Sequence, residues 1–195
     1  NVQMSSNLIP TEHILDTVQI SPDQFLDCAQ ALIHTILFHR AIDTLVTPKS
    51  IHMTGVDIAY ASAETEEVTQ YIISRLNPLQ DSIFEDPKDC WIVLSLAFNV
   101  PKKGWFRDTY STEIWERWCI SFSFATLTAQ DIREAMLHTI TQITLKANAS
   151  EIPKIPSIDS SFKFTLSLPT DKDSDISSEL KKLIFVLSVI SIMLI

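Results

Sequence analysis

The chain has 195 residues, of which 46 % are hydrophobic, and a formal net charge of −9. This length fits one domain that buries a real core, and a hydrophobic chain with only two glycines is neither disordered nor a turn-dense barrel. The acidic balance argues against nucleic-acid binding, because no basic stripe is present to neutralise phosphates. We therefore expect a single domain over residues 1–195, with residues 1–12 loosely ordered.

The N-terminal region predicts a strand followed by a long helix. Residues 14–20 alternate between apolar and polar side chains, which is a strand pattern. Ser21 suits the N-cap position, Pro22 suits the first helical position, and apolar residues then recur at helical spacing until about Arg40.

A second strand and a second helix come next in the chain. Residues 51–61 have a strand composition, with Gly55 at a bulge. A helix is expected to open near Ser62. It should end at Asn77 and Pro78, because proline cannot donate the helical hydrogen bond.

Two neighbouring segments, residues 91–100 and 114–124, alternate with a period of two and predict an antiparallel hairpin. Their connection, residues 101–113, is long for a hairpin, and loops of this length are usually functional or disordered. Adjacent Trp105 and Phe106 lie in this connection between charged residues. From the residues alone, the two rings either protrude or fold back over the sheet edge as a small apolar cluster.

The C-terminal third predicts one more helix and one more strand. Thr128 and Asp131 form an approximate capping box for a helix that runs to about Lys146, and residues 162–168 alternate as a strand. Residues 183–195 carry no charge. As a helix they would span roughly 20 Å, short of the ~30 Å core of a bilayer. We therefore expect residues 183–195 to dock on the domain itself or on a partner, and the alternative is a membrane anchor. Their composition is compatible with a helix and with a strand.

The whole pattern is that of an α+β domain with several antiparallel strands and three helices. The cysteines, Cys28, Cys90 and Cys119, are odd in number and lie at no metal-ligand spacing, so we expect reduced, buried thiols in a cytosolic protein. His34 and His39 point in different directions around their helix and do not form a metal pair. We expect no catalytic residue, no cofactor and no metal, so the chain does not read as an enzyme.

Six short segments stand in order along the chain: ALIHTILFHR at 31–40, VDIAY at 56–60, KKGWF at 102–106 with IWERW at 114–118, IPKIP at 152–156, FKF at 162–164 and LKKLI at 180–184. Together these segments resemble the autophagy-related protein 101 family of HORMA-domain proteins, and the resemblance extends over about residues 14–184. The resemblance implies a HORMA-like fold, a mixed and mostly antiparallel sheet packed with three main helices.

The same resemblance implies a function. The chain would be a non-enzymatic adaptor of the autophagy-initiation complex that forms a heterodimer with the HORMA domain of autophagy-related protein 13 and stabilises it. Trp105 and Phe106 match the family's exposed WF finger, which recruits downstream autophagy factors. The implied location is the cytoplasm and the preautophagosomal structure, or phagophore assembly site, with no nucleic acid bound and no membrane span. The alternatives are a tail-anchored membrane protein that uses residues 183–195, and an unrecognised enzyme.

Overall fold

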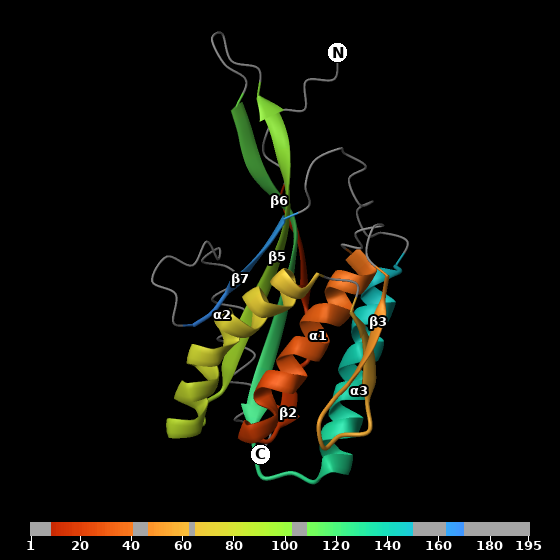
Figure 1. Ribbon diagram of the computed structural model, residues 1–195, viewed down its shortest axis with the longest axis vertical. Helices are drawn as coiled ribbons and strands as arrows, with labels where there is room; N and C mark the ends of the chain where they lie inside the picture. Colours follow the sequence, from red (N-terminus) through yellow and green to blue (C-terminus); the bar gives the residue numbers. More distant parts are fainter. Residues whose placement is uncertain (1–8, 41–46, 63–64, 103–108, 150–162, 170–195) are drawn as a thin grey trace.

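The computed structural model describes residues 9–40, 47–62, 65–102, 109–149 and 163–169 (Figure 1). In chain order the elements are β1 Thr11–Ile14, β2 Val18–Ile20, the 3-10 turn η1 Pro22–Gln24, α1 Phe25–Arg40, β3 Lys49–His52, β4 Ala59–Ser62, α2 Glu66–Glu85, β5 Cys90–Lys102, β6 Thr109–Phe124, α3 Ala129–Ala147 and β7 Lys163–Ser167.

The main sheet is mixed and mostly antiparallel. Its strand order is β1-β6-β5-β7, and β2 also pairs with β6. β5 pairs antiparallel with both β6 and β7, whereas β1 and β2 run parallel to β6. β3 and β4 form a separate two-stranded sheet. With three helices α1, α2 and α3 packed on the main sheet, this architecture confirms the predicted α+β, HORMA-like class.

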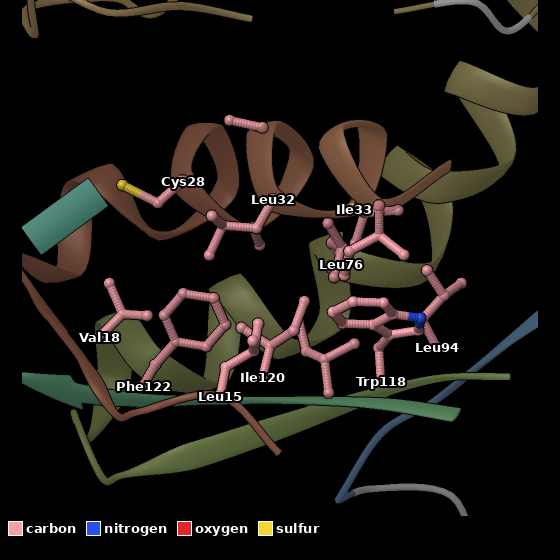
Figure 2. Packing of buried hydrophobic residues seen from close by; sticks show 14 of the residues in the cluster. Leu15, Val18, Cys28, Leu32, Ile33, Leu76, Leu94, Trp118, Ile120 and Phe122 are labelled. Atoms are coloured by element: carbon pink, nitrogen blue, oxygen red, sulfur yellow. The ribbon is translucent and has the colours of Figure 1, made fainter. Parts of the chain in front are cut away.

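The core lies between α1 and the inward face of the β5–β6 hairpin (Figure 2). Most of the side chains predicted to share one face of each strand are buried there, whereas Phe98 and Phe124 of the same faces are only partly buried. The buried ones are Ile92, Leu94, Leu96, Trp118, Ile120 and Phe122. Full burial of one such side chain is worth about 1.5–3 kcal/mol, so this period-two pattern is a main determinant of the fold.

The predicted N-terminal strand is wrong in one respect, because it is two strands. The chain leaves the strand pattern between β1 and β2, and Leu15 and Val18 are both buried although they are three residues apart. The Leu15 amide still donates to the Cys119 carbonyl at 3.1 Å. β1 begins at Thr11, so it takes in the last two residues of the segment expected to be loosely ordered.

Ser21 does not cap the first helix as predicted. Pro22 does open the turn that leads into α1, but the Ser21 side chain makes no capping hydrogen bond. Its hydroxyl instead accepts a hydrogen bond from the Leu127 amide at 3.3 Å, which connects the start of the helix to the end of β6.

Residues 51–61 are not one strand either. They form most of a hairpin in which β3 pairs with β4 in register His52↔Ala59. Gly55 lies in the connection with φ +74, a left-handed conformation that favours glycine, so this residue marks a turn rather than a bulge. The connection is closed by a hydrogen bond of 2.9 Å from the Met53 amide to the Ile58 carbonyl.

The second helix continues through Pro78 to Glu85, beyond its predicted end. An interior proline costs about 3 kcal/mol, yet the turns after it bury Leu79 and Ile83. The Gln80 side chain also accepts from the Leu26 amide and donates to the Pro22 carbonyl, both at 3.1 Å. Tertiary contacts thus offset the local cost, which no local pattern reveals.

The remaining predicted elements are confirmed. Thr128 and Asp131 form a reciprocal capping box at the start of α3, and β7 lies within residues 162–168. The three cysteines are free and buried. Of the described helices, none is both long enough and apolar enough to cross a membrane. The family-like segment 152–156 and the predicted apolar segment 183–195 lie outside the described residues.

Candidate functional site

The β5–β6 hairpin is longer, and its connection shorter, than the sequence predicts. The pairing continues to Lys102↔Thr109, so only residues 103–108 join the two strands, instead of residues 101–113. Figure 1 shows the paired ends of both strands projecting beyond the three helices. β7 pairs only as far as Ala97, so at Pro101 strand β5 has β6 as its one paired neighbour, the edge position to which prolines in sheets are usually confined.

Trp105 and Phe106 lie in this connection and outside the described residues. The structure brings together the strands that flank them, and their exposure stays a prediction.

At its root the hairpin carries a β-bulge. Leu96 is opposite Glu116 and Ala97 is opposite Ile114, which leaves Trp115 as the extra residue. Both Trp115 and Glu116 are buried, although neighbours in a regular strand point to opposite faces. The bulge therefore turns two consecutive side chains toward the helices.

The inward carboxylate of Glu116 is neutralised by Arg40 at the end of α1. Arg40 Nε donates to both Glu116 oxygens at 3.1 and 3.0 Å, and Nη2 donates to Oε2 at 2.8 Å. Trp118 Nε1 donates to Glu116 Oε1 at 2.7 Å. A buried carboxylate needs a paired and hydrogen-bonded environment of this kind.

Aromatic rings enclose this ion pair. The Arg40 guanidinium lies 5.0 Å from the centre of the Trp115 ring, within cation–π range. The His13 ring of β1 stacks on Trp118 at 4.2 Å between centres. His13 Nε2 lies 3.2 Å from Glu116 Oε1, although outside hydrogen-bonding geometry. These contacts join β1, α1 and β6 at one point, which we call the root cluster: His13, Arg40, Trp115, Glu116 and Trp118.

The root cluster keeps Glu116 ionised. Burial alone would raise the pKa of its carboxyl, but the contacts with His13 and Arg40 outweigh this effect and hold the pKa below its usual value. Sequence reasoning missed the cluster. A signal was present, since extending the alternation back from Trp118 puts Glu116 on the inward face, where a carboxylate needs a cation.

The side chains that most often carry chemistry are dispersed or weakly reactive among the described residues. The described residues contain no group of three or more His, Cys, Asp or Glu side chains that could hold a metal ion. Burial raises the pKa of the Cys28 and Cys90 thiols to about 12 and that of Cys119 to about 11, which makes all three poor nucleophiles. His34 and His39 make separate contacts, with Ser62 and Thr144 respectively.

The outer face of α3 offers a second surface for contacts. Leu145 is 68 % exposed and Leu137, two turns earlier, is 39 % exposed, whereas Met136 and Ile143 on the inner face are buried. The outer face of α3 therefore leaves two large apolar side chains uncovered.

A mixed sheet with three packed helices and a long projecting hairpin defines an α+β domain of the HORMA-like class. A family model for autophagy-related protein 101 matches residues 17–161. The chain belongs to this family, and membership assigns it an autophagy-related function. A comparison with curated proteins gives no match.

Proposed function

We propose that this protein is a non-enzymatic adaptor of autophagy initiation, built as a single HORMA domain. It pairs one-to-one with the HORMA domain of autophagy-related protein 13 and stabilises it. It recruits downstream factors through Trp105 and Phe106 at the preautophagosomal structure. Family membership and the segments that resemble this family carry the proposal as a whole.

The single observation that supports the recruiting role is the projecting hairpin. Strand pairing holds Lys102 next to Thr109, so the six residues between them must leave and return at the tip. The root cluster ties the other end of the ladder to α1 and β1. A paired ladder with an anchored base is a rigid support, and rigid support lowers the entropy that a binding loop loses when it engages a partner.

The outer face of α3 supports the pairing role. Leu137 and Leu145 are large, exposed and on one helix, and a partner that covers them would bury apolar surface worth about 25 cal/mol per Å². We assign the partner HORMA domain to this face. The partner should raise the melting temperature of the chain by mass action, since it binds the folded state alone.

A pull-down tests the recruiting role. The bait is the chain in complex with the partner HORMA domain, either unchanged or with Trp105→Ala and Phe106→Ala. Mass spectrometry compares the proteins captured from cell extract. We expect both baits to keep the partner HORMA domain and the double variant alone to lose a set of autophagy factors. Equal capture by both baits would refute the recruiting role and leave the pairing role standing.

Pairing has its own measurement. Light scattering of the mixture should give the mass of a one-to-one heterodimer. A homodimer of the chain that ignores the partner HORMA domain would contradict the proposal.

A further inference from the structure

Four side chains in the middle of the main sheet are buried on the side that faces away from α1, α2 and α3, whereas Thr165 at the β7 edge of that side is exposed. We call this buried area the far face and define it by Val93, Ser95 and Ala97 of β5 and Cys119 of β6. These four side chains are between 0 % and 4 % exposed. Val93 lies directly opposite Cys119 in the ladder, and Ile14 and Trp91 pack at the edge of this pair.

None of the described elements accounts for this burial. The apolar cluster on the far face consists of strand residues, and the described helices contribute instead to the larger core on the opposite side (Figures 1 and 2). An antiparallel sheet with one face in water exposes the side chains of that face, which are normally polar. Ser95, Ala97 and Cys119 are also too small to shield one another, so the far face requires a cover.

We propose that residues 183–195 dock on the far face and complete the fold as an intrachain cover. This segment is uncharged and rich in large aliphatic residues. Large side chains laid on a floor of Ser, Ala and Cys fill the space that these small residues leave, as close packing of a protein interior requires.

Chain connectivity favours this segment over the others. Residues 41–46 and 63–64 each join a helix to a strand of the β3–β4 sheet, and residues 103–108 join β5 to β6, so both ends of each segment are fixed by described elements. Residues 150–162 carry Glu151, Lys154 and Asp159 together with two prolines, and residues 1–8 are mainly polar.

The segment can also reach the far face. β7 lies beside β5 with Ser167 paired to Val93, so the chain leaves the sheet next to the far face. Residues 170–182 then provide a connection that spans roughly 40 Å when extended, more than the width of this sheet.

Docking on the far face excludes use of the same residues as a membrane anchor, because one segment cannot cover the sheet and lie in lipid at once. It also predicts that the cover protects the Cys119 thiol from reaction. Burial raises the pKa of the Cys119 thiol to about 11, and loss of the cover would expose it and increase its thiolate fraction.

The first test uses the full chain with Val186→Asp and Ile190→Asp and measures the rate of maleimide labelling at each cysteine. We expect Cys119 to react at least about tenfold faster than in the unchanged chain, since local opening exposes it. Cys28 and Cys90 belong to the helix-side core and should stay protected, so they report that the rest of the fold is intact. Unchanged protection of Cys119 in a folded variant would overturn the proposal.

The second test gives an answer even if the charged variant unfolds. Val189→Cys, Ile190→Cys and Ser191→Cys are made one at a time in the otherwise unchanged chain and oxidised mildly with diamide. A disulfide requires Cα atoms about 5.5 Å apart, so at least one of three consecutive positions should join to Cys119. The matched control is Ser160→Cys in the segment before β7. A cross-link to Cys119 from position 160, with none from positions 189–191, would assign the cover to another segment and overturn the proposal.

Discussion

Arg40 and Glu116 are 76 residues apart in the chain, and three hydrogen bonds of 2.8–3.1 Å join them in the interior. Arg40 is 4 % exposed and Glu116 is fully buried. Because Arg40 ends α1 and Glu116 follows the bulge in β6, this pair fixes the helix to the root of the projecting hairpin.

Removal of the cation should destabilise the domain strongly. Arg40→Met leaves the Glu116 carboxylate buried without its main partner, which typically costs about 3–5 kcal/mol. The denaturant midpoint from circular dichroism measures the loss. Lys88→Met, which breaks an exposed pair with Asp86, is the control and should leave the midpoint unchanged.

A second substitution should recover part of that loss. Glu116→Gln in the Arg40→Met background removes the unpaired charge and keeps an oxygen that accepts from Trp118 Nε1. We expect the double variant to be more stable than Arg40→Met alone by at least about 1 kcal/mol. If the single and double variants unfold together, the charge of Glu116 is not the cause of the loss.

Acid should destabilise the domain through His34. This side chain is buried, with its Nδ1 atom 3.1 Å from the Ser62 hydroxyl, and burial lowers its pKa to about 4. In the unfolded chain the pKa returns to about 6.5. Between these two values the unfolded state binds a proton that the folded state does not. The free energy of unfolding therefore falls as the pH drops from about 6.5 toward about 4, by up to roughly 3 kcal/mol.

His34→Gln should flatten this part of the pH dependence, because glutamine does not titrate. The measurement is the free energy of unfolding at several pH values across that window. His52→Gln, at an exposed position of β3, serves as the control and should keep the original slope. An unchanged slope in His34→Gln would show that other groups cause the acid sensitivity.

Local sequence patterns correctly predicted the elements whose buried side chains follow a regular apolar period. Strands β5 and β6 follow from strict alternation, and α3 follows from its apolar period and the Thr128 capping box. The wrong element boundaries occur where contacts with residues distant in sequence determine the backbone conformation. α2 passes Pro78 because later turns bury Leu79, and the chain between β1 and β2 leaves the strand pattern where Leu15 is buried.

One part of the candidate site could be predicted from the sequence, and the other part could not. The hairpin and its aromatic connection could be predicted from alternation and from the position of Trp105. The root cluster could not be assembled, because the partner of Glu116 comes from a helix that the sequence places far away. Nothing local marks Arg40 as more than the last residue of an apolar helix, and only the fold brings it to the bulge.

The outer face of α3 should carry the pairing with the HORMA domain of autophagy-related protein 13. Leu145→Glu puts a charge at the most exposed leucine of this helix, so it should weaken the heterodimer by about tenfold or more while leaving the fold intact. Isothermal titration measures the change. Phe84→Glu is the matched control, because Phe84 is similarly exposed on α2, away from α3. If Phe84→Glu weakens the heterodimer and Leu145→Glu does not, the pairing face lies on α2.

The last prediction concerns the stability of the hairpin tip. Trp105→Ala with Phe106→Ala should change the free energy of unfolding by no more than about half a kcal/mol, as exposed substitutions do. Trp115→Ala is the matched comparison inside the same hairpin. Trp115 is buried at the bulge and covers Arg40, so its truncation should cost about 3–5 kcal/mol.

Denaturant midpoints of the two variants, measured together with heterodimer formation, separate a binding role for the tip aromatics from a structural one. The inward faces of β5 and β6 already supply the hairpin with core contacts through Leu94, Leu96 and Trp118, so the fold has no need of the two tip rings. The double variant should therefore unfold like the unchanged chain and still bind its partner. A loss of several kcal/mol in that variant would mean that Trp105 and Phe106 are core residues, and the exposed recruiting loop would have to be abandoned.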